Sequence, residues 1–395
     1  MAHRDDTSIS VEDKKEIYRA FIEWMKNGWY GVPESDEVEP LMMARYSPEE
    51  ATLLTGFPFA PMSLDELSQL KKIPALELEH KLVELARKGI VYRYVNKNTV
   101  FYSLHDTFSM LRTLGWQGKT DDYTRTVSPI LNRYCATGFL SPWKLTTHQA
   151  LRVLPIESTI KDGRQVIPYE EVTKILDNVT YFTVSPCPCA HRNNLDSERH
   201  DCTYPIERCL HFGRLGHYIV EQGMGREITR QETEELLRKC EELGLVHAIS
   251  NQQENPDTLC NCCPCCCMWF EAYHKLDHPM SMSPSHYRAH TGDTTCTGCG
   301  LCVKRCPMKA IQLKEMPEAK GRKTVVTEEK KGTRTLTNKL GKVAEVTTER
   351  CIGCGVCVHK CPSGSLSLTQ SESVQDPPKT IRDWAIQFMT DCRNS

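Results

Sequence analysis

The chain has 395 residues, of which 39% are hydrophobic and 25% are charged, a composition typical of a globular protein with ordinary cores. Its formal net charge of −2 argues against a protein that binds nucleic acid or anionic lipid over its whole surface. No segment approaches the roughly 18–20 consecutive apolar residues of a membrane span, and the charged start lacks the apolar core of a secretory signal. We therefore expect a cytoplasmic protein without membrane insertion.

The N-terminal pattern predicts a disordered lead over residues 1–15 and a domain over 16–118. Within that domain Ser63 begins a short helix, and Glu66 stands three residues later, which is the spacing of a capping box. A second helix follows, and the alternating segment 90–104 indicates two strands joined by an Asn-Lys-Asn turn. The order of two helices and a β-ribbon resembles a winged helix-turn-helix domain.

That resemblance implies DNA binding, but the charges of the second predicted helix oppose it. Glutamates and basic residues balance along this helix, which is unfavourable for a phosphate surface. The residues concerned are Glu77, Glu79, Glu84, Lys81, Arg87 and Lys88. We expect a packing or partner-docking module and do not expect DNA as a partner.

Cysteine is the outlier of the composition, with 21 residues that gather in two regions. In a long chain without a secretory signal, clustered cysteines favour metal binding over disulfides. After a connecting α/β segment at 119–180, the first region spans 181–290 and predicts a cysteine-rich α+β domain. Its candidate metal ligands are Cys187, Cys189, Cys202, Cys209, Cys260, Cys262, Cys263, Cys265, Cys266 and Cys267.

These ligands cannot all serve one cluster, because neighbouring side chains of an extended segment face opposite sides. We expect one or two further iron–sulfur clusters in this domain. The sequence favours one site built from Cys187, Cys189, Cys202 and Cys209, with the cysteines of 260–267 serving that site or another. Cys240 lies inside a predicted helix and is expected to be an ordinary core residue.

The second cysteine region, residues 291–370, repeats the motif C-x2-C-x2-C-x3-C-P, at Cys296–Pro307 and at Cys351–Pro362. This is the bacterial ferredoxin pattern, in which the fourth cysteine binds the other cluster. The resemblance to two-cluster ferredoxins implies one [4Fe-4S] cluster on Cys296, Cys299, Cys302 and Cys361. It implies a second on Cys351, Cys354, Cys357 and Cys306. Structural zinc is the alternative, and two complete copies with the terminal Cys-Pro argue against it.

About 44 residues separate the two motifs, and this insertion includes a basic segment at 323–339 that predicts an exposed hairpin. The segments CPCAHR, DCTYPIERCLHFG and CNCCPCCC, taken with the ferredoxin motifs, resemble an uncharacterised family of multi-cluster iron–sulfur proteins. Residues 371–395 end the chain with a predicted amphipathic helix. The fold class is therefore multidomain α+β: a winged-helix-like domain, a cysteine-rich middle domain and a ferredoxin-like domain with two clusters.

These features indicate an electron carrier or a subunit of a redox complex rather than a stand-alone catalyst. The sequence has no dinucleotide fingerprint and no Walker motif, so a partner protein, of flavin-containing type, would supply hydride chemistry. Two alternatives stay open. One is a winged-helix regulator that senses redox state or iron, and the other is an oxidoreductase with a substrate-binding cluster in the Cys187–Cys267 region.

Overall fold

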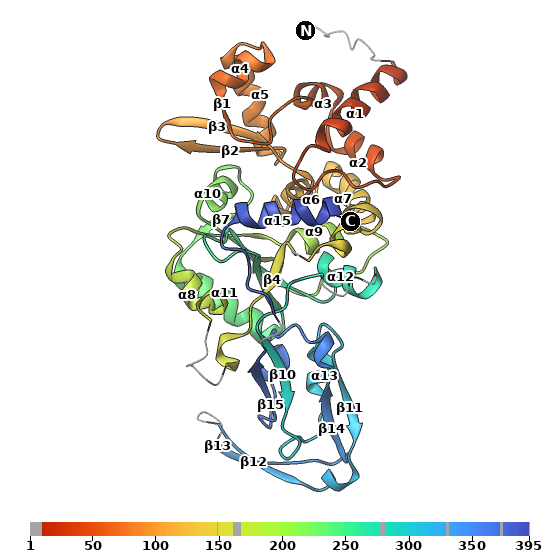
Figure 1. The fold of residues 1–395 in the computed structure, drawn as a ribbon, viewed down its shortest axis with the longest axis vertical. Coiled ribbons are helices and arrows are strands. Elements are labelled where there is room, and N and C mark those ends of the chain that lie inside the picture. Colours follow the sequence, from red (N-terminus) through yellow and green to blue (C-terminus); the bar gives the residue numbers. More distant parts are fainter. Residues whose placement is uncertain are drawn as a thin grey trace. The chain divides into compact units, whose positions relative to one another are not determined.

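The computed structural model describes residues 10–147, 149–160, 167–276, 278, 281–328, 332–371 and 374–394. The chain is a mixed α/β protein, and its elements group into two compact units (Figure 1). The first unit comprises residues 1–143, 185–202 and 217–226, and the second comprises 144–184, 203–216 and 227–395. The two units therefore alternate along the chain. No helix among the described residues is long and apolar enough to cross a bilayer.

The first unit begins with helix α1 (Val11–Met25), which starts where the Ser10 hydroxyl accepts a hydrogen bond from the Asp13 backbone N–H. This start falls inside the segment 1–15 that was expected to be disordered, of which residues 1–9 lie outside the described residues. The other helices of this unit are α2 (Val38–Arg45), α3 (Pro48–Leu54), α4 (Leu64–Lys71), α5 (Ala75–Arg87), α6 (Thr107–Trp116), α7 (Asp122–Tyr134) and α9 (Pro188–Asn194).

The first unit also contains a three-stranded sheet in the order β1-β3-β2. Its strands are β1 (Met62–Ser63), β2 (Val91–Asn96) and β3 (Thr99–Leu104). The capping box predicted at Ser63 and Glu66 is confirmed at the start of α4. The predicted turn is also confirmed, because Lys97 and Asn98 have positive φ angles of 46° and 67° between two paired strands. Up to residue 104 the described chain thus follows the order three helices, strand, two helices and hairpin.

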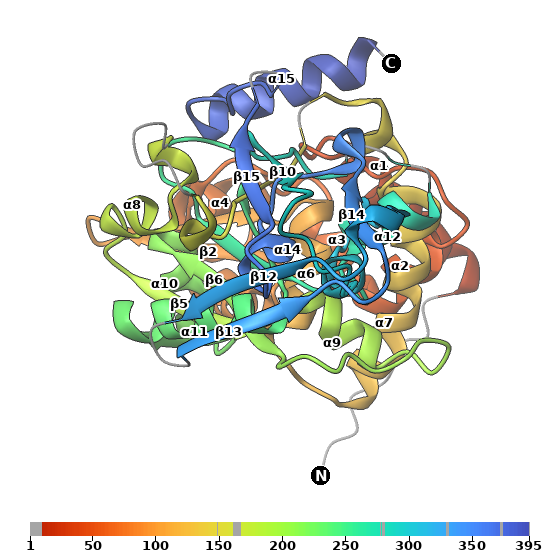
Figure 2. The same ribbon diagram turned by 90° about the horizontal axis from the view of Figure 1, so that it is seen from below.

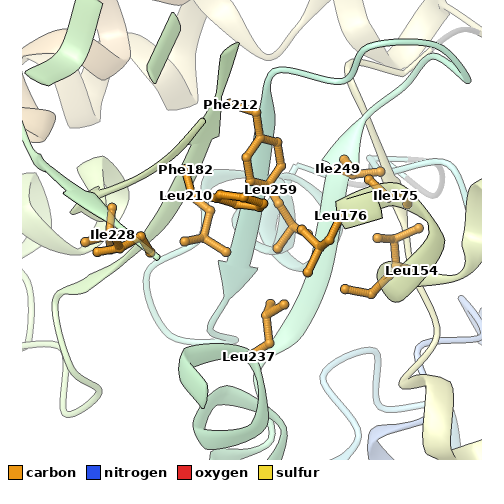
Figure 3. Close-up of a cluster of buried hydrophobic side chains, with 12 residues drawn as sticks. Leu154, Ile175, Leu176, Phe182, Leu210, Phe212, Ile228, Leu237, Ile249 and Leu259 are labelled. Carbon is orange, nitrogen blue, oxygen red and sulfur yellow. The ribbon is translucent and has the colours of Figure 1, made fainter. Parts of the chain in front are cut away.

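The second unit is built on a six-stranded sheet in the order β4-β8-β9-β6-β5-β7. The strands are β4 (Leu151–Val153), β5 (Phe182–Pro186), β6 (Glu207–Phe212), β7 (Arg226–Ile228), β8 (Val246–Ser250) and β9 (Thr258–Cys262). Helices α8 (Val172–Asp177), α11 (Arg230–Leu243) and α12 (Met268–Lys275) accompany them, whereas α10 (Gly213–Glu221) begins in this unit and continues into the first unit after Gly216. Side chains from the strands, α8 and α11 form one buried core, shown in Figure 3, which includes Phe182, Leu210, Phe212, Leu237 and Leu259.

The ferredoxin-like part of the second unit has two antiparallel strand pairs and two short helices. The pairs are β10 (Tyr287–Thr291) with β15 (Leu366–Gln370), and β11 (Ile311–Glu315) with β14 (Lys342–Val346). The helices are α13 (Leu301–Arg305) and α14 (Val356–His359). Strands β12 (Lys323–Glu328) and β13 (Gly332–Thr337) form a long hairpin (Figure 2). This hairpin lies within the basic segment that the sequence predicted to form one.

Helix α15 (Ile381–Asn394) packs on the second unit through Trp384, Ala385 and Phe388, which are 2–3% exposed. The Trp384 indole N–H donates to the carbonyl of Gln149 at 2.9 Å. Ile381 and Met389, at the margins of the predicted apolar face, stay 50% and 37% exposed. The described part of this helix is therefore fixed by a narrow face that covers its own chain.

A test of the core compares two leucines of the same helix, α11. Leu237 is 4% exposed and packs in the core, whereas Leu243 is 44% exposed. We expect Leu237→Ala to lower the free energy of unfolding by about 2 to 5 kcal/mol, because it removes buried methyl groups and leaves a cavity. Leu243→Ala should change it by about 0.5 kcal/mol or less. Denaturant titration followed by circular dichroism measures both, and equal effects would contradict this packing.

Candidate metal centres

The first ferredoxin motif forms a small cavity lined by four cysteines. Cys296 and Cys299 lie in the turn before α13, and Cys302 lies in the first turn of that helix. Cys361 comes from the second motif. Cys296 and Cys302 are buried, whereas Cys299 is exposed. The backbone N–H of Ala344 donates to Cys296 Sγ at 3.3 Å, as expected for a sulfur that is to carry negative charge. Four thiols and an amide donor thus converge on one enclosed space.

The second motif gathers the other four cysteines in the same way. Cys306, Cys351, Cys354 and Cys357 lie close enough that their charges influence one another. Backbone N–H groups again reach the sulfurs, from Ala310 to Cys306 Sγ at 3.3 Å and from Ala289 to Cys351 Sγ at 3.4 Å. In each set, the fourth cysteine of one motif lies with the first three cysteines of the other.

Two glycines explain how the motif turns fit so closely against neighbouring backbone. Gly298 has φ +65°, and a Cβ built on it would lie 2.5 Å from the carbonyl oxygen of Lys342. Gly353 has φ +72°, and its Cβ would lie 2.1 Å from the carbonyl oxygen of Tyr287. Any side chain at these positions would have to push the turn away from the strands. The glycines therefore let the cysteine loops sit directly on the sheet.

Burial makes most of these thiols hard to ionise without a cation. Desolvation, with the nearby charges of Cys299, Cys361 and Cys296, raises the pKa of Cys302 to about 11. Burial also raises the pKa of Cys354 and of Cys357, reinforced for each by neighbouring cysteines. Cys361 differs, because hydrogen bonds from Ser365, Leu366 and Ser363 outweigh its burial and lower its pKa. Metal ions displace protons from such thiols and supply the missing positive charge, so the donor sets fit iron–sulfur clusters.

Comparison with known protein families gives one match. Residues 295–365 match the 4Fe-4S dicluster domain family. No solved structure was found that is significantly similar to the chain. The match covers both cysteine motifs and the insertion between them, and it supports two [4Fe-4S] clusters in this dicluster domain. Domains of this kind transfer single electrons.

The upstream cysteines divide between the two units. Cys187 and Cys189 lie at the N-terminal end of α9 in the first unit, and Cys202 is the last residue of that unit's segment 185–202. The other seven lie in the second unit, on β6, on β9 and in the turn before α12. Cys240, in α11, is 4% exposed and lies among core side chains, as expected from the sequence.

The register of the sheet brings Cys209, Cys260 and Cys262 to one face. Strands β6 and β9 pair so that Leu210 is opposite Leu259, and continuing this register places Cys209 opposite Cys260. Cys262 is two residues further on β9 and faces the same side as Cys260. Side-chain contacts join Cys209 to Cys260, Cys260 to Cys262, and Cys262 to Cys267. These hydrogen bonds between thiols, together with burial, raise the pKa of Cys209 and Cys262.

The next cysteines form a separate and tighter group. The Sγ atoms of Cys263, Cys265 and Cys266 all lie within 4.8 Å of one another. Arg208, which is 1% exposed, donates from Nη2 to Cys263 Sγ at 3.2 Å. This arginine was not recognised from the sequence, since nothing in the pattern around Cys209 distinguishes it from an exposed strand residue. Only the strand pairing places it beside the turn of Cys263.

A chain of polar contacts connects this group to the dicluster domain within the second unit. Asn261 exchanges hydrogen bonds with the backbone and side chain of Arg208, and its Oδ1 lies 2.6 Å from His247 Nδ1. His247 Nε2 lies 3.4 Å from Glu241 Oε1 at the end of α11. Arg305 of the dicluster domain then donates to the carbonyls of Glu241 and Glu242 at 3.0 and 3.2 Å. The cation at this helix C-terminus ties α11 to the dicluster domain.

Several histidines near the cysteines have other partners. His211 contacts Cys209, and His274 Nε2 lies 2.7 Å from the carbonyl oxygen of Pro307. His286 Nδ1 lies 2.8 Å from Glu170 Oε1, and its Nε2 lies 3.2 Å from Asp376 Oδ1. The contacts of His274 and His286 are structural hydrogen bonds to protein oxygens.

Two glycines, one within the second motif and one just after it, test the close packing of the motif's turn. Gly353 and Gly364 both have positive φ angles, but a Cβ on Gly364 would meet nothing within 4 Å. Both alanine variants therefore carry similar backbone strain, and only Gly353→Ala clashes. We expect Gly353→Ala to lose about half of the roughly eight iron atoms of the dicluster domain, and Gly364→Ala to keep them. Iron analysis of anaerobically purified protein measures this, and equal iron in the two variants would refute the steric explanation.

The pairing of His286 with Glu170 predicts a pH-dependent contribution to stability. The hydrogen bond to Glu170 raises the pKa of His286 above its ordinary value of 6.5. A raised folded pKa gives stability that is complete below the unfolded pKa and is lost as the pH rises through the folded value. We expect His286→Gln to lower the melting temperature more at about pH 6 than at about pH 9. His290→Gln, at an exposed position of β10, is the control and should show no such difference.

Proposed function

We propose that this protein relays single electrons between a flavin-containing partner and a further acceptor. Support comes from the two complete cysteine sets of the dicluster domain, each with backbone N–H donors aimed at its sulfurs. When bound, a [4Fe-4S] cluster accepts or gives one electron at a time. The protein's own residues would bind the clusters, exclude water from buried sulfurs and set the charge around them.

The ligand assignment follows the crossed arrangement of the motifs. Cys296, Cys299, Cys302 and Cys361 would bind one cluster, and Cys351, Cys354, Cys357 and Cys306 the other. The cavity lined by the first set and the mutual charge effects within the second set support this division. The flavin-type partner is proposed because the chain has no recognisable nucleotide-binding motif of its own.

A third cluster would lie on the sheet of the second unit, on Cys209, Cys260, Cys262 and Cys267. The sequence favoured Cys187, Cys189 and Cys202 as companions of Cys209. The strand register favours Cys260 instead, because the two residues are direct cross-strand neighbours. Contacts run along this set from Cys209 to Cys267. Such an extended set suits a cluster, in which each thiolate binds a different iron.

The β12–β13 hairpin is the proposed docking surface for an acidic redox partner. Lys320 and Lys323 are exposed at its base, and Arg334 is exposed on β13. Charges on a protruding ribbon accelerate encounter with a partner of opposite charge. The rate of electron transfer to that partner should therefore fall as ionic strength rises.

The helices and hairpin of residues 16–118 are proposed to be a winged-helix-like scaffold rather than a DNA reader. The order of elements supports the fold. The charges of α5 oppose DNA binding, because Lys81 pairs with Glu77 at 2.9 Å and Lys88 pairs with Glu50 at 2.5 Å. Phosphate binding would have to break these pairs.

Cysteine variants of the full chain test the crossed ligand sets. Cys361→Ser should lose the same EPR signal as Cys299→Ser, although Cys361 belongs to the second motif. Cys306→Ser should lose the same signal as Cys354→Ser. Cys240→Ser, which replaces a buried cysteine outside all sets, should leave both signals unchanged.

Two results would overturn the proposal. If Cys361→Ser and Cys354→Ser removed the same signal, the clusters would not cross between the motifs. If anaerobically purified protein contained zinc and showed no visible absorption, the electron-transfer function itself would fail.

A further inference from the structure

We propose that the turn Cys263–Cys266 holds a single thiophilic metal ion, Zn²⁺ or Fe²⁺, distinct from all of the clusters. The site would lie on the side of β9 opposite to Cys260 and Cys262. Asn261 faces that side of the strand, and Cys263, the first residue after β9, continues the alternation toward it. Arg208 is opposite Asn261 in the same register and reaches Cys263 from β6.

The spacing of the sulfurs favours one ion over a cluster. A tetrahedral ion with metal–sulfur bonds of about 2.3 Å holds its thiolates about 3.8 Å apart. Cys263, Cys265 and Cys266 have their Sγ atoms within 4.8 Å of one another, and those of Cys265 and Cys266 are 3.4 Å apart. In a cubane, each thiolate binds a different iron, so three sulfurs that are all this close to one another do not suit it; in the set of Cys209, Cys260, Cys262 and Cys267, by contrast, the contacts join successive members.

The dicluster domain provides an internal comparison. Its eight cysteines are all described, yet neither set contains three sulfurs as close together as these. The same holds for Cys209, Cys260, Cys262 and Cys267 among the described residues. The tight group therefore differs from the sets proposed to bind clusters.

The turn itself is built to present three sulfurs. The backbone N–H of Cys267 donates to the carbonyl of Cys263 at 3.3 Å, which closes the loop immediately before α12. The first N–H groups of this eight-residue helix follow the loop, and their partial positive charge favours thiolates over thiols. Two independent features, the closed loop and the helix start, thus act on the same sulfurs.

Arg208 supplies the charge that such a site needs. A divalent ion with three or more thiolates has a net negative charge, which is costly to bury. The guanidinium of Arg208 is itself buried and donates to one of the three sulfurs at 3.2 Å. Its Nε–H donates to the carbonyl of Asn261 at 3.0 Å, which fixes its direction. Arg208 is thus a positioning and charge-compensating residue rather than a ligand.

Acid-labile sulfide separates a single ion from a cluster, because only a cluster contains it. We expect full-length Cys265→Ser/Cys266→Ser, purified anaerobically, to lose about one metal ion per chain with its sulfide content unchanged. Cys209→Ser/Cys262→Ser should lose about four irons and about four sulfides instead. In both variants the two EPR signals of the dicluster domain should persist. A result against the single metal ion can therefore be distinguished from a result against the electron-transfer proposal. Cys240→Ser is the control.

A loss of iron and sulfide together in Cys265→Ser/Cys266→Ser would show that this group binds a cluster. Unchanged metal content would show that it binds nothing, and a Cys265–Cys266 disulfide in the anaerobic protein would also overturn the proposal.

Arg208 variants keep the test valid if the cysteine variant does not fold. We expect Arg208→Gln to weaken binding of Co²⁺ to metal-depleted protein by about tenfold or more, followed through thiolate-to-metal absorption bands. Arg208→Lys should restore most of the affinity. Equal affinity in the wild-type protein and both variants would contradict the role of Arg208.

Discussion

Buried thiols that lie close together cannot all become thiolates unless positive charge lies among them, and the second unit is organised around this constraint. Burial and neighbouring sulfurs raise the pKa of Cys302, Cys354 and Cys357 in the dicluster domain. Contacts between thiols do the same for Cys209 and Cys262 on the sheet. As thiolates without a cation, these groups would oppose folding through mutual repulsion and desolvation. With metal bound, the same crowding becomes a source of stability, since binding free energy adds to folding free energy.

The positive charges that the protein itself supplies are few and specific. Arg208 reaches a sulfur directly, whereas Arg305 acts through carbonyls at the end of α11 and lies near Cys354 and Cys357. Between them, Asn261, His247 and Glu241 form a continuous set of hydrogen bonds and close polar contacts. Such a network joins the sheet to the dicluster domain, as the proposed electron transfer between their centres would require. It also makes Arg208 sensitive to substitution, because its partners Asn261 and Cys263 are buried.

Much of this organisation could be predicted from local sequence. The repeated motif identified the dicluster domain because its spacing and glycines reflect the geometry of a single turn around a cluster. The capping box at Ser63 and the turn at Lys97–Asn98 were likewise local signals. The grouping of the upstream cysteines into separate sites could not be predicted from local sequence. It depends on which strand lies beside β9, and nothing in the residues around Cys209 indicates that Cys260, rather than Cys187, is its neighbour.

The alternation of side chains along one strand would let a single segment contribute to both the proposed third cluster and the proposed metal ion. Cys260 and Cys262 face one side of β9, and Cys263 continues the line of Asn261 on the other. Two adjacent cysteines at the end of a strand therefore place their sulfurs on opposite faces. Two cysteines separated by one residue would place them on the same face. A shift of one residue in the pairing of β9 would exchange the two groups and bring Asn261 to the face of Cys209. The hydrogen bonds between Asn261 and Arg208 oppose that shift, since they join the two strands through side chains as well as backbone. The arginine that compensates charge at Cys263 thus also helps to fix the register that separates the two sites.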